Sequence, residues 1–324
     1  MRVLVIGGTL FIGRRLVRRL LGEGHEVAVL HRRDRHELGP EVENLTGDRI
    51  DPESVRRARA GRRFGWVFDN VYDWERGTTA AQVEGTARAC GNVSRYVFLS
   101  SVAAYGEGLD HREEDPLAPA NHPEPYVGNK AESERALLRL HGAEGFPAVT
   151  LRPPYVYGPE NPFYREAFFW DRFAAGRPVI VPGDGSRLMQ FVFVDDLVEA
   201  CLRAAREPAA VGEAFNIADP RPVTQRELVL ALARAAGGEP RIVHVPRDRI
   251  AALGGNPMGP DNLYFAVYFD MPPITQNIEK ARRLLGFEST PLDAALRATY
   301  VWYREHHRKP APDYGFEDKL IRGG

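Results

Sequence analysis

The chain has 324 residues, of which 44% are hydrophobic and 27% are charged, and its formal net charge is −1. A chain of this size and composition can bury a large core, so we expect one large domain or a domain with a smaller lobe. Non-specific nucleic-acid binding needs a basic surface, and the near-neutral charge supplies no global excess, although the many arginines leave a local basic patch open.

The cysteines and the N-terminal segment concern the compartment in which the protein works. Cys90 and Cys201 lie far apart among apolar or small residues, which favours two buried thiols over a disulfide or a metal pair. The apolar run at 2–6 meets glycines and then arginines, and it is too short for a signal peptide. Since no segment is long enough to span a bilayer, we expect a cytoplasmic protein with no membrane partner.

The N-terminal segment predicts a βαβ unit. Residues 2–6 are apolar and rich in β-branched side chains, which is typical of a fully buried strand. Along 11–22 the apolar residues share one helical face and four arginines take the other, which indicates an amphipathic helix. Glycines end this helix, and residues 26–31 predict a second strand.

The same alternation of strands and helices continues along the first half of the chain. We predict strands at 65–70, 95–100 and 148–151, and helices at 78–90 and 126–141. Repeated βα units require a parallel sheet with helices on both faces. The sequence therefore predicts an α/β fold of the Rossmann type, with a doubly wound parallel sheet.

After residue 151 the regular pattern decays. Prolines, glycines and aromatic residues interrupt 153–190 and again 246–275. Helices are predicted at 194–206 and 224–236. Interruptions of this kind late in a doubly wound chain are typical of a substrate-binding lobe.

These patterns predict the domain organisation. Residues 1–152 form a dinucleotide-binding domain, to which 191–220 returns. Residues 153–190 and 221–309 form a smaller C-terminal substrate-binding lobe. We expect 310–324 to be a loosely held C-terminal tail, because it begins with prolines and ends in charges and glycines.

A glycine-rich turn, Val5-Ile6-Gly7-Gly8-Thr9-Leu10-Phe11-Ile12-Gly13, joins the first strand to the first helix. A dinucleotide diphosphate meets a helix N-terminus at this position, where backbone N–H groups and the helix dipole hold the phosphates. A structural turn without a ligand is the alternative. Leu10 stands where a middle glycine is usual, so its side chain must point away from the diphosphate. The residues predicted to bind the cofactor here are Gly7, Thr9, Leu10, Phe11, Ile12 and Gly13.

Basic residues follow the second strand, where an acid normally accepts from the adenosine ribose. The sequence there is His31, Arg32, Arg33. The cationic pair suits a 2′-phosphate and favours NADP over NAD, with a solvated basic loop as the alternative. Asp48, followed by Arg49, is placed either to accept from the adenine amino group or to serve as a turn residue or helix cap. We place all five residues in the cofactor site.

Tyr126, Lys130 and Ser101 are the predicted catalytic residues. A spacing of four puts Tyr126 and Lys130 on one helical face. A neighbouring ammonium favours the phenolate and lowers a tyrosine pKa that is normally about 10. Ser101 follows the strand at 95–100, and its hydroxyl can bond the same substrate oxygen. A chance pair of this spacing is usually an exposed helical pair, but its order after the glycine turn and the serine makes the pattern specific.

On these residues the chain resembles the extended, epimerase/dehydratase branch of the short-chain dehydrogenase/reductase superfamily. The resemblance runs from Met1 to about Tyr303 and includes the 25-residue interval from Ser101 to Tyr126 (126 − 101 = 25). It also includes Gly47-Asp48, Leu151-Arg152-Pro153-Pro154-Tyr155-Val156-Tyr157-Gly158-Pro159, Gly183-Asp184-Gly185-Ser186, Phe191-Val192-Phe193-Val194-Asp195-Asp196 and Lys280-Ala281-Arg282-Arg283-Leu284-Leu285-Gly286-Phe287.

The resemblance implies a role for each residue of the predicted centre. Tyr126 would give or take the proton, Lys130 would hold the nicotinamide ribose, and Ser101 would polarise the carbonyl or alcohol while hydride moves to or from NAD or NADP. Pro153 would line the cofactor site.

Several positions depart from the pattern of the family that the chain resembles. Gln82 stands where an asparagine is common. Tyr155 and Met189 replace an asparagine and an arginine that normally help to grip the diphosphate of a nucleotide sugar, and Arg187 is a candidate replacement. A standard nucleotide-sugar substrate is therefore less expected than the redox chemistry. The predicted substrate residues are Ala103, Tyr155, Arg187 and Met189.

The predicted function is that of an NAD(P)-dependent oxidoreductase of the epimerase/dehydratase type, acting on a sugar-like or other hydroxylated small molecule. The alternative is a non-catalytic Rossmann-fold RNA-binding or scaffolding protein, because the glycine turn also resembles isoflavone-reductase-like and chloroplast stem-loop RNA-binding proteins. The intact catalytic residues and the near-neutral charge argue against nucleic acid as a partner. We expect no metal site, and we expect a homodimer in which the helices at 78–90 and 126–141 pair across a two-fold axis.

Overall fold

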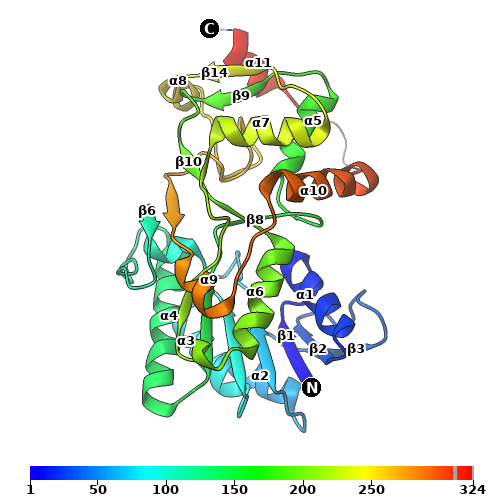
Figure 1. Ribbon diagram of the computed structural model, residues 1–324, viewed down its shortest axis with the longest axis vertical. Helices are drawn as coiled ribbons and strands as arrows, with labels where there is room; N and C mark the ends of the chain where they lie inside the picture. Colours follow the sequence, from blue (N-terminus) through cyan, green and yellow to red (C-terminus); the bar gives the residue numbers. More distant parts are fainter. Residues whose placement is uncertain (309–311, 323–324) are drawn as a thin grey trace.

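The computed structural model describes residues 1–308 and 312–322. A larger domain with a central sheet occupies the lower part of Figure 1 and contains the N-terminus. A smaller lobe above it contains α7, α10 and the last described helix. This division agrees with the predicted Rossmann-type domain and smaller C-terminal lobe.

Seven parallel strands form the sheet, in the order β12-β7-β5-β4-β1-β2-β3. Their bounds are β1 Arg2–Ile6, β2 Glu26–His31, β3 Val42–Thr46, β4 Trp66–Asp69, β5 Arg95–Leu99, β7 Ala148–Arg152 and β12 Ala214–Asn216. The chain moves outward in opposite directions from β1 and β4. In such sheets a ligand crevice opens at the carboxyl ends of the strands beside this switch point.

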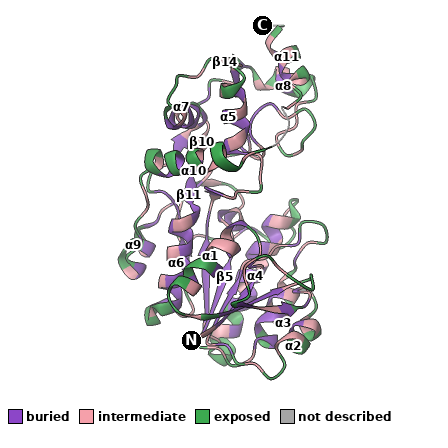
Figure 2. Cartoon of the chain, turned by 90° about the vertical axis from the view of Figure 1, so that its right-hand side faces the viewer, coloured by how far each residue is buried: buried purple, intermediate pink, exposed green. Residues whose placement is uncertain are grey.

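Helices cover both faces of the sheet because the strands carry apolar side chains toward each face. Val3 and Val5 belong to the same core cluster as α1 (Phe11–Gly22) and α6 (Val194–Arg206). Leu4 and Ile6 belong to a second cluster with α2 (Pro52–Arg59), α3 (Ala80–Ala89) and α4 (Pro125–Glu144). In Figure 2 the strands of the sheet are mostly buried, and the helices around them carry buried, intermediate and exposed residues.

The lobe is built from short strand pairs and helices. Its helices are α5 Glu166–Ala174, α7 Gln225–Ala236, α8 Arg247–Ala252 and α10 Leu292–His306, and α9 Glu279–Leu285 lies near β12. Four two-stranded pairs connect the lobe internally or to the domain: β8 Tyr155–Tyr157 with β11 Phe191–Phe193, β9 Val179–Pro182 with β14 Ile242–Val245, β10 Leu188–Met189 with β13 Val223–Thr224, and β6 Gly108–His111 with β15 Ile274–Gln276. Short 3₁₀ helices span Val102–Tyr105 and Pro208–Ala210.

The expectation of a loosely held tail is wrong for residues 315–322. They form α11 (Gly315–Arg322), and Leu320 is only 1% exposed. Glu317 is buried and binds the Arg172 guanidinium, with Nε 3.1 Å from Oε2. The partner lies 145 residues earlier in the chain, so the local sequence carried no sign of it. The parts of the predicted tail at 310–311 and 323–324 lie outside the described residues.

The four arginines of α1 are bound by carboxylates rather than gathered into a free basic patch. Arg15 binds Asp195 in the first turn of α6, at 2.5 and 2.6 Å. Arg14 and Arg18 both bind Glu160, and Arg19 binds Glu23 and Glu199. The helix face that looked basic in the sequence therefore packs against acidic groups of α6 and the lobe.

Two further expectations concern the cysteines and the membrane. Cys90 and Cys201 are both buried and free, which confirms the prediction of core thiols. Among the described helices, none has the length and apolar character required to cross a bilayer.

Candidate active site

A cavity of about 2030 Å³ lies at the carboxyl ends of the parallel strands and reaches the lobe. It brings together nearly all of the residues that the sequence predicted for the site. Those that line it are Gly7, Thr9, Leu10, Phe11, Ile12, His31, Arg32, Arg33, Asp48, Arg49, Ser101, Ala103, Tyr126, Lys130, Pro153, Tyr155 and Met189. Gly13 and Arg187 are not among its lining residues.

The turn after β1 has the shape that a diphosphate requires. Gly7 adopts a φ of +83°, and a Cβ at Gly13 would lie 2.0 Å from the Gly7 carbonyl oxygen. Glycine at both positions therefore lets the helix start pack directly on the turn. Leu10 occupies the N-cap, where its side chain cannot accept from the helix N–H groups, and it is 65% exposed. The first-turn N–H groups are thus left for an anionic ligand, and Leu10 does not fill their site.

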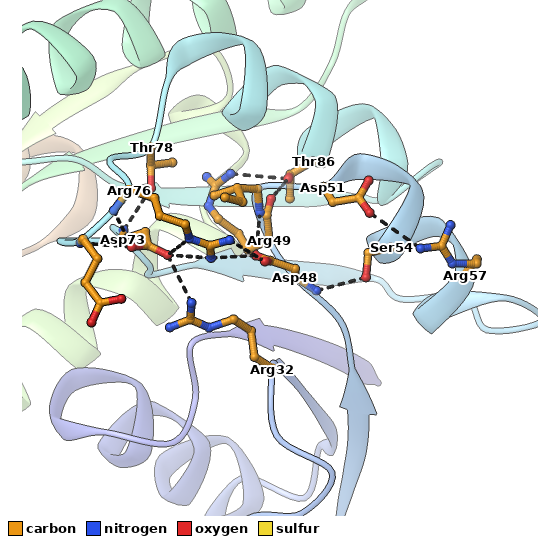
Figure 3. A network of polar contacts seen from close by, with 12 residues as sticks. Arg32, Asp48, Arg49, Asp51, Ser54, Arg57, Asp73, Arg76, Thr78 and Thr86 are labelled. Atoms are coloured by element: carbon orange, nitrogen blue, oxygen red, sulfur yellow. Dashed lines mark hydrogen bonds and ion pairs between the residues drawn. The ribbon is translucent and has the colours of Figure 1, made fainter.

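An ionic network occupies the end of the cleft beyond β2 (Figure 3). Arg76 bridges two carboxylates, donating to Asp48 at 2.9 Å and to Asp73 at 2.7 Å, and Arg32 reaches Asp73 at 3.3 Å. Burial opposes ionisation of Asp48, but Arg76, the Ile50 N–H and Arg32 together outweigh it and hold the pKa of that carboxyl below its usual value. Asp48 also accepts from the Ile50 N–H at 3.2 Å, so it is a turn residue and a cavity residue at once.

Two other predicted cofactor residues, Arg49 and His31, bind neighbouring side chains. Arg49 is 4% exposed, and its guanidinium donates to the buried Asp69 carboxylate at 2.5 Å. His31 places Nε2 2.6 Å from the Asn44 side chain. Gln82, which departed from the expected asparagine, completes the capping box of α3 with Thr79.

The three predicted catalytic residues lie at one wall of the cavity. Tyr126 is in the first turn of α4, and Lys130 follows one turn later with only 5% of its surface exposed. Lys130 Nζ donates to the Leu99 carbonyl at 2.7 Å and lies 5.8 Å from the Tyr126 ring centroid. Ser101 caps the 3₁₀ helix after β5 by accepting from the Ala103 N–H at 3.2 Å, and it lines the same cavity as Tyr126.

The charge state of this pair differs from the expectation. Burial raises the pKa of Tyr126, and the Ser101 hydroxyl and the Arg165 charge offset only part of that effect. Burial also lowers the pKa of Lys130 to about 8, against the opposing charge of Asp69. The predicted lowering of the tyrosine pKa is therefore wrong for this structure, because desolvation dominates and Lys130 does not offset it. Tyr126 is held protonated, which suits a proton donor.

The lowered pKa of Lys130 predicts a pH-dependent stability. Between the folded value of about 8 and the ordinary value of 10.5, the unfolded chain binds more protons, so stability rises with pH. Below pH 8 the buried ammonium is charged and costly in the folded state. We expect Lys130→Met to melt at a higher temperature than the wild type below pH 8, with the gap closing towards pH 10.5. Thermal unfolding at a series of pH values measures this gap, and a gap independent of pH would contradict the assignment.

An aromatic wall beside Tyr126 was missed by the sequence analysis. Trp74 stacks on the Tyr126 ring with centroids 4.8 Å apart, and Tyr72 meets it edge-on at 4.7 Å. Asn129 donates to the Tyr72 hydroxyl at 3.1 Å. Both aromatic residues lie in the loop after β4, at the switch point of the sheet. A tyrosine and a tryptophan directly after a buried strand were the available signal.

A buried polar network behind the wall was also missed. Arg152 donates to Glu134 at 2.7 and 2.9 Å and to the Tyr105 hydroxyl at 2.6 Å. Glu134 also binds the Ser100 hydroxyl, directly before Ser101. Glu134 continues the spacing of four from Lys130 along α4, which was a usable signal. The network fixes the start of the segment that carries Ser101.

Of the predicted substrate residues, three line the cavity and one does not. Tyr155 and Met189 line the cavity, as does Ala103. Arg187 instead directs Nη1 to Asp270, at 2.9 Å, and to nearby carbonyl groups. The charged residue that the lobe contributes to the cavity is Arg165, which the sequence analysis did not single out.

Comparison with known proteins adds a family to this geometry. Residues 3–218 match the model of the NAD dependent epimerase/dehydratase family. The chloroplast stem-loop binding protein of 41 kDa b of Arabidopsis thaliana is 33% identical over 307 residues, covering 89% of this chain and 75% of that protein. The UDP-glucose 4-epimerase of Mycolicibacterium smegmatis is 31% identical over 281 residues, covering 76% of this chain and 87% of that one.

A solved structure agrees with these relatives. The crystal structure of a UDP-glucose 4-epimerase from Thermotoga maritima with UDP-glucose has a TM-score of 0.74 and 25% identity, and covers 95% of this chain and 100% of its own. The match spans the parallel sheet, the glycine turn and the wall that carries Tyr126. The chain therefore belongs to the NAD dependent epimerase/dehydratase family, and it is an enzyme that works with a nicotinamide adenine dinucleotide cofactor.

Proposed function

We propose that this enzyme moves hydride to or from a carbinol or carbonyl carbon of a sugar-like or other hydroxylated small molecule, with Tyr126 as the acid or base. The observation that carries the proposal is that Ser101, Tyr126 and Lys130 line one cavity together with the glycine turn. Two hydroxyl groups thus face the same cavity, where they can bind and protonate a developing alkoxide.

Each residue has a part in this proposal. The dinucleotide, when bound, supplies the carbon that gives or takes hydride. The turn Gly7–Gly13 holds the diphosphate, and Lys130 binds ribose hydroxyls. Ser101 orients the substrate oxygen while Tyr126 gives its proton to that oxygen or takes it back. Trp74 covers one face of Tyr126 and keeps water from its ring.

The test is dinucleotide binding followed by turnover. Binding of NAD and NADP is measured by fluorescence on the purified protein. UDP-sugars, 3-oxoalkanoates and aliphatic alcohols are then offered, and the change in nicotinamide absorbance, or epimerised product, is recorded. A protein that binds neither dinucleotide and converts none of these classes would contradict the proposal.

The basic residues beyond β2 support a preference for NADP. Arg33 is exposed at the cavity edge, whereas Arg32 is held by Asp73. We expect Arg33→Ala to weaken NADP binding by roughly tenfold or more, because a charge-assisted bond to the 2′-phosphate is lost. NAD binding should stay nearly unchanged and serves as the control. Equal affinity of the wild type for both dinucleotides would remove the preference.

RNA binding is a second candidate, because one relative is named a stem-loop binding protein and is 33% identical. The net charge of −1 and the carboxylate partners of the α1 arginines count against it. A stem-loop RNA titrated at two salt concentrations decides the matter. Tight binding that falls steeply with salt, in a protein that retains no dinucleotide, would favour this candidate.

We also propose a homodimer and a cytoplasmic location. Helices α3 and α4 lie side by side, and Leu138 on α4 is 60% exposed. A pair of such helices can meet its copy across a two-fold axis. Sedimentation that finds only monomer at micromolar concentration would end the dimer proposal.

A further inference from the structure

Arg165 is a buried cation in the part of the cavity wall that the lobe supplies. Only 9% of its surface is exposed. Its guanidinium carbon lies 4.6 Å from the ring centroid of Phe163 and 5.2 Å from that of Tyr155. The rings of Phe269 and Tyr268 follow at 5.6 and 6.0 Å. Aromatic faces therefore hold the cation in place.

The protein leaves most of this guanidinium without a partner. Among residues 1–308 and 312–322, no carboxylate forms an ion pair with it, and Nε has no hydrogen-bond partner. Nη1 reaches only the Val156 carbonyl, at 3.5 Å. The neighbouring Glu166 accepts instead from Asn161, at 3.0 Å, and burial raises the pKa of Glu166 to about 7. A buried charge without a partner is costly, so its retention points to a ligand that supplies the counter-charge.

The surroundings of Arg165 describe that ligand. Of the described lining residues between 153 and 274, Arg165 alone carries a charge. The others include Met189, Met271 and several prolines and aromatic residues. Arg165 and Tyr126 line the same cavity. A substrate that reaches both therefore needs one anionic group and an otherwise apolar body.

We propose that Arg165 binds a carboxylate of the substrate, and that the substrate is a monoanion with an apolar or aromatic body rather than a nucleoside diphosphate sugar. A planar guanidinium matches a carboxylate through two parallel hydrogen bonds. A diphosphate would bring two charges to a region with one cation. The inference rests on the proposed function, because it names the substrate class of the same cavity.

The experiment is calorimetric titration with octanoate, octanol and UDP-glucose, on the enzyme loaded with whichever of NAD and NADP it binds more tightly. The variants are Arg165→Met and Arg165→Lys, with Arg221→Met as the matched control, since Arg221 is an exposed lobe arginine paired with Glu227. We expect octanoate to bind the wild type and Arg221→Met alike. Its affinity should fall roughly ten- to hundredfold in Arg165→Met and by less in Arg165→Lys. Octanol should bind weakly and equally to all four proteins.

Stability gives a second, independent readout. Because Arg165→Met removes an unpaired buried charge, we expect it to melt at a higher temperature than the wild type while binding octanoate less well. A lower melting temperature with unchanged octanoate affinity would assign Arg165 a structural role and overturn the proposal. UDP-glucose that binds more tightly than octanoate would overturn the monoanion assignment.

Failure of this inference and of the proposed function can be told apart. Titration with octanoate measures binding and needs no turnover. If octanoate binding depends on Arg165 but turnover does not depend on Tyr126, the proposed chemistry fails and the carboxylate site stands. If turnover depends on Tyr126 but octanoate binding does not depend on Arg165, the carboxylate site fails and the proposed chemistry stands.

Discussion

Tyr126→Phe is expected to lower kcat by about 10²- to 10⁴-fold, because it removes the hydroxyl that exchanges a proton with the substrate oxygen. The substituted ring keeps its stacking on Trp74 and its edge contact with Tyr72. The fold and the affinity for NAD should therefore change little. Steady-state turnover, together with dinucleotide titration, measures the two effects separately.

Tyr72→Phe is the matched control, since it removes a hydroxyl from the same aromatic wall. That hydroxyl accepts from Asn129 at 3.1 Å and is not assigned to proton transfer. We expect its effect on kcat to be much smaller than that of Tyr126→Phe. Unchanged turnover in Tyr126→Phe, or equal losses in both variants, would contradict the assignment of Tyr126.

Glu134→Leu is expected to destabilise the protein by about 3–5 kcal/mol, because it leaves the Arg152 guanidinium buried without a counter-charge. Each side chain of the pair is 5% exposed. The Ser100 hydroxyl loses its partner as well. Urea unfolding of the variant and the wild type measures the difference in free energy.

The double variant Glu134→Leu/Arg152→Met distinguishes two causes of instability: the loss of the ion pair itself, and the cost of leaving Arg152 buried without a counter-charge. Replacing both members of a buried pair by apolar residues is often neutral or stabilising. We therefore expect the double variant to recover most of the stability that the single variant loses. A double variant as unstable as the single one, or a single variant within about 1 kcal/mol of the wild type, would show that the pair does not have this role.

The fold of the domain could be predicted because its signals are local. The first strand, the first helix and the second strand occur at the predicted residues 2–6, 11–22 and 26–31. The helix predicted at 126–141 is longer, Pro125–Glu144, because proline begins it and Gly145 adopts a left-handed conformation at its end. The short strand pairs of the lobe were not predicted, because two or three residues carry too little periodicity.

The site was predictable to the same extent. That Ser101, Tyr126 and Lys130 line one cavity could be predicted from their spacing along the chain, and their catalytic role stays a proposal. The sequence could not show that Arg165, rather than Arg187, lines the cavity. Only the folded lobe determines which guanidinium binds Asp270 and which faces the cavity. The pKa of Tyr126 was missed for a related reason, since desolvation depends on everything that packs around the ring.

The ion pair between Arg172 and Glu317 bears on how the chain is completed during synthesis. Arg172 is 2% exposed and Glu317 is equally buried. The guanidinium therefore lacks its counter-charge until residue 317 has been synthesised, and the strands up to β7 are made well before that point. A chain truncated before residue 315 would retain the whole parallel sheet. It would leave the Arg172 guanidinium buried in the lobe without its counter-charge.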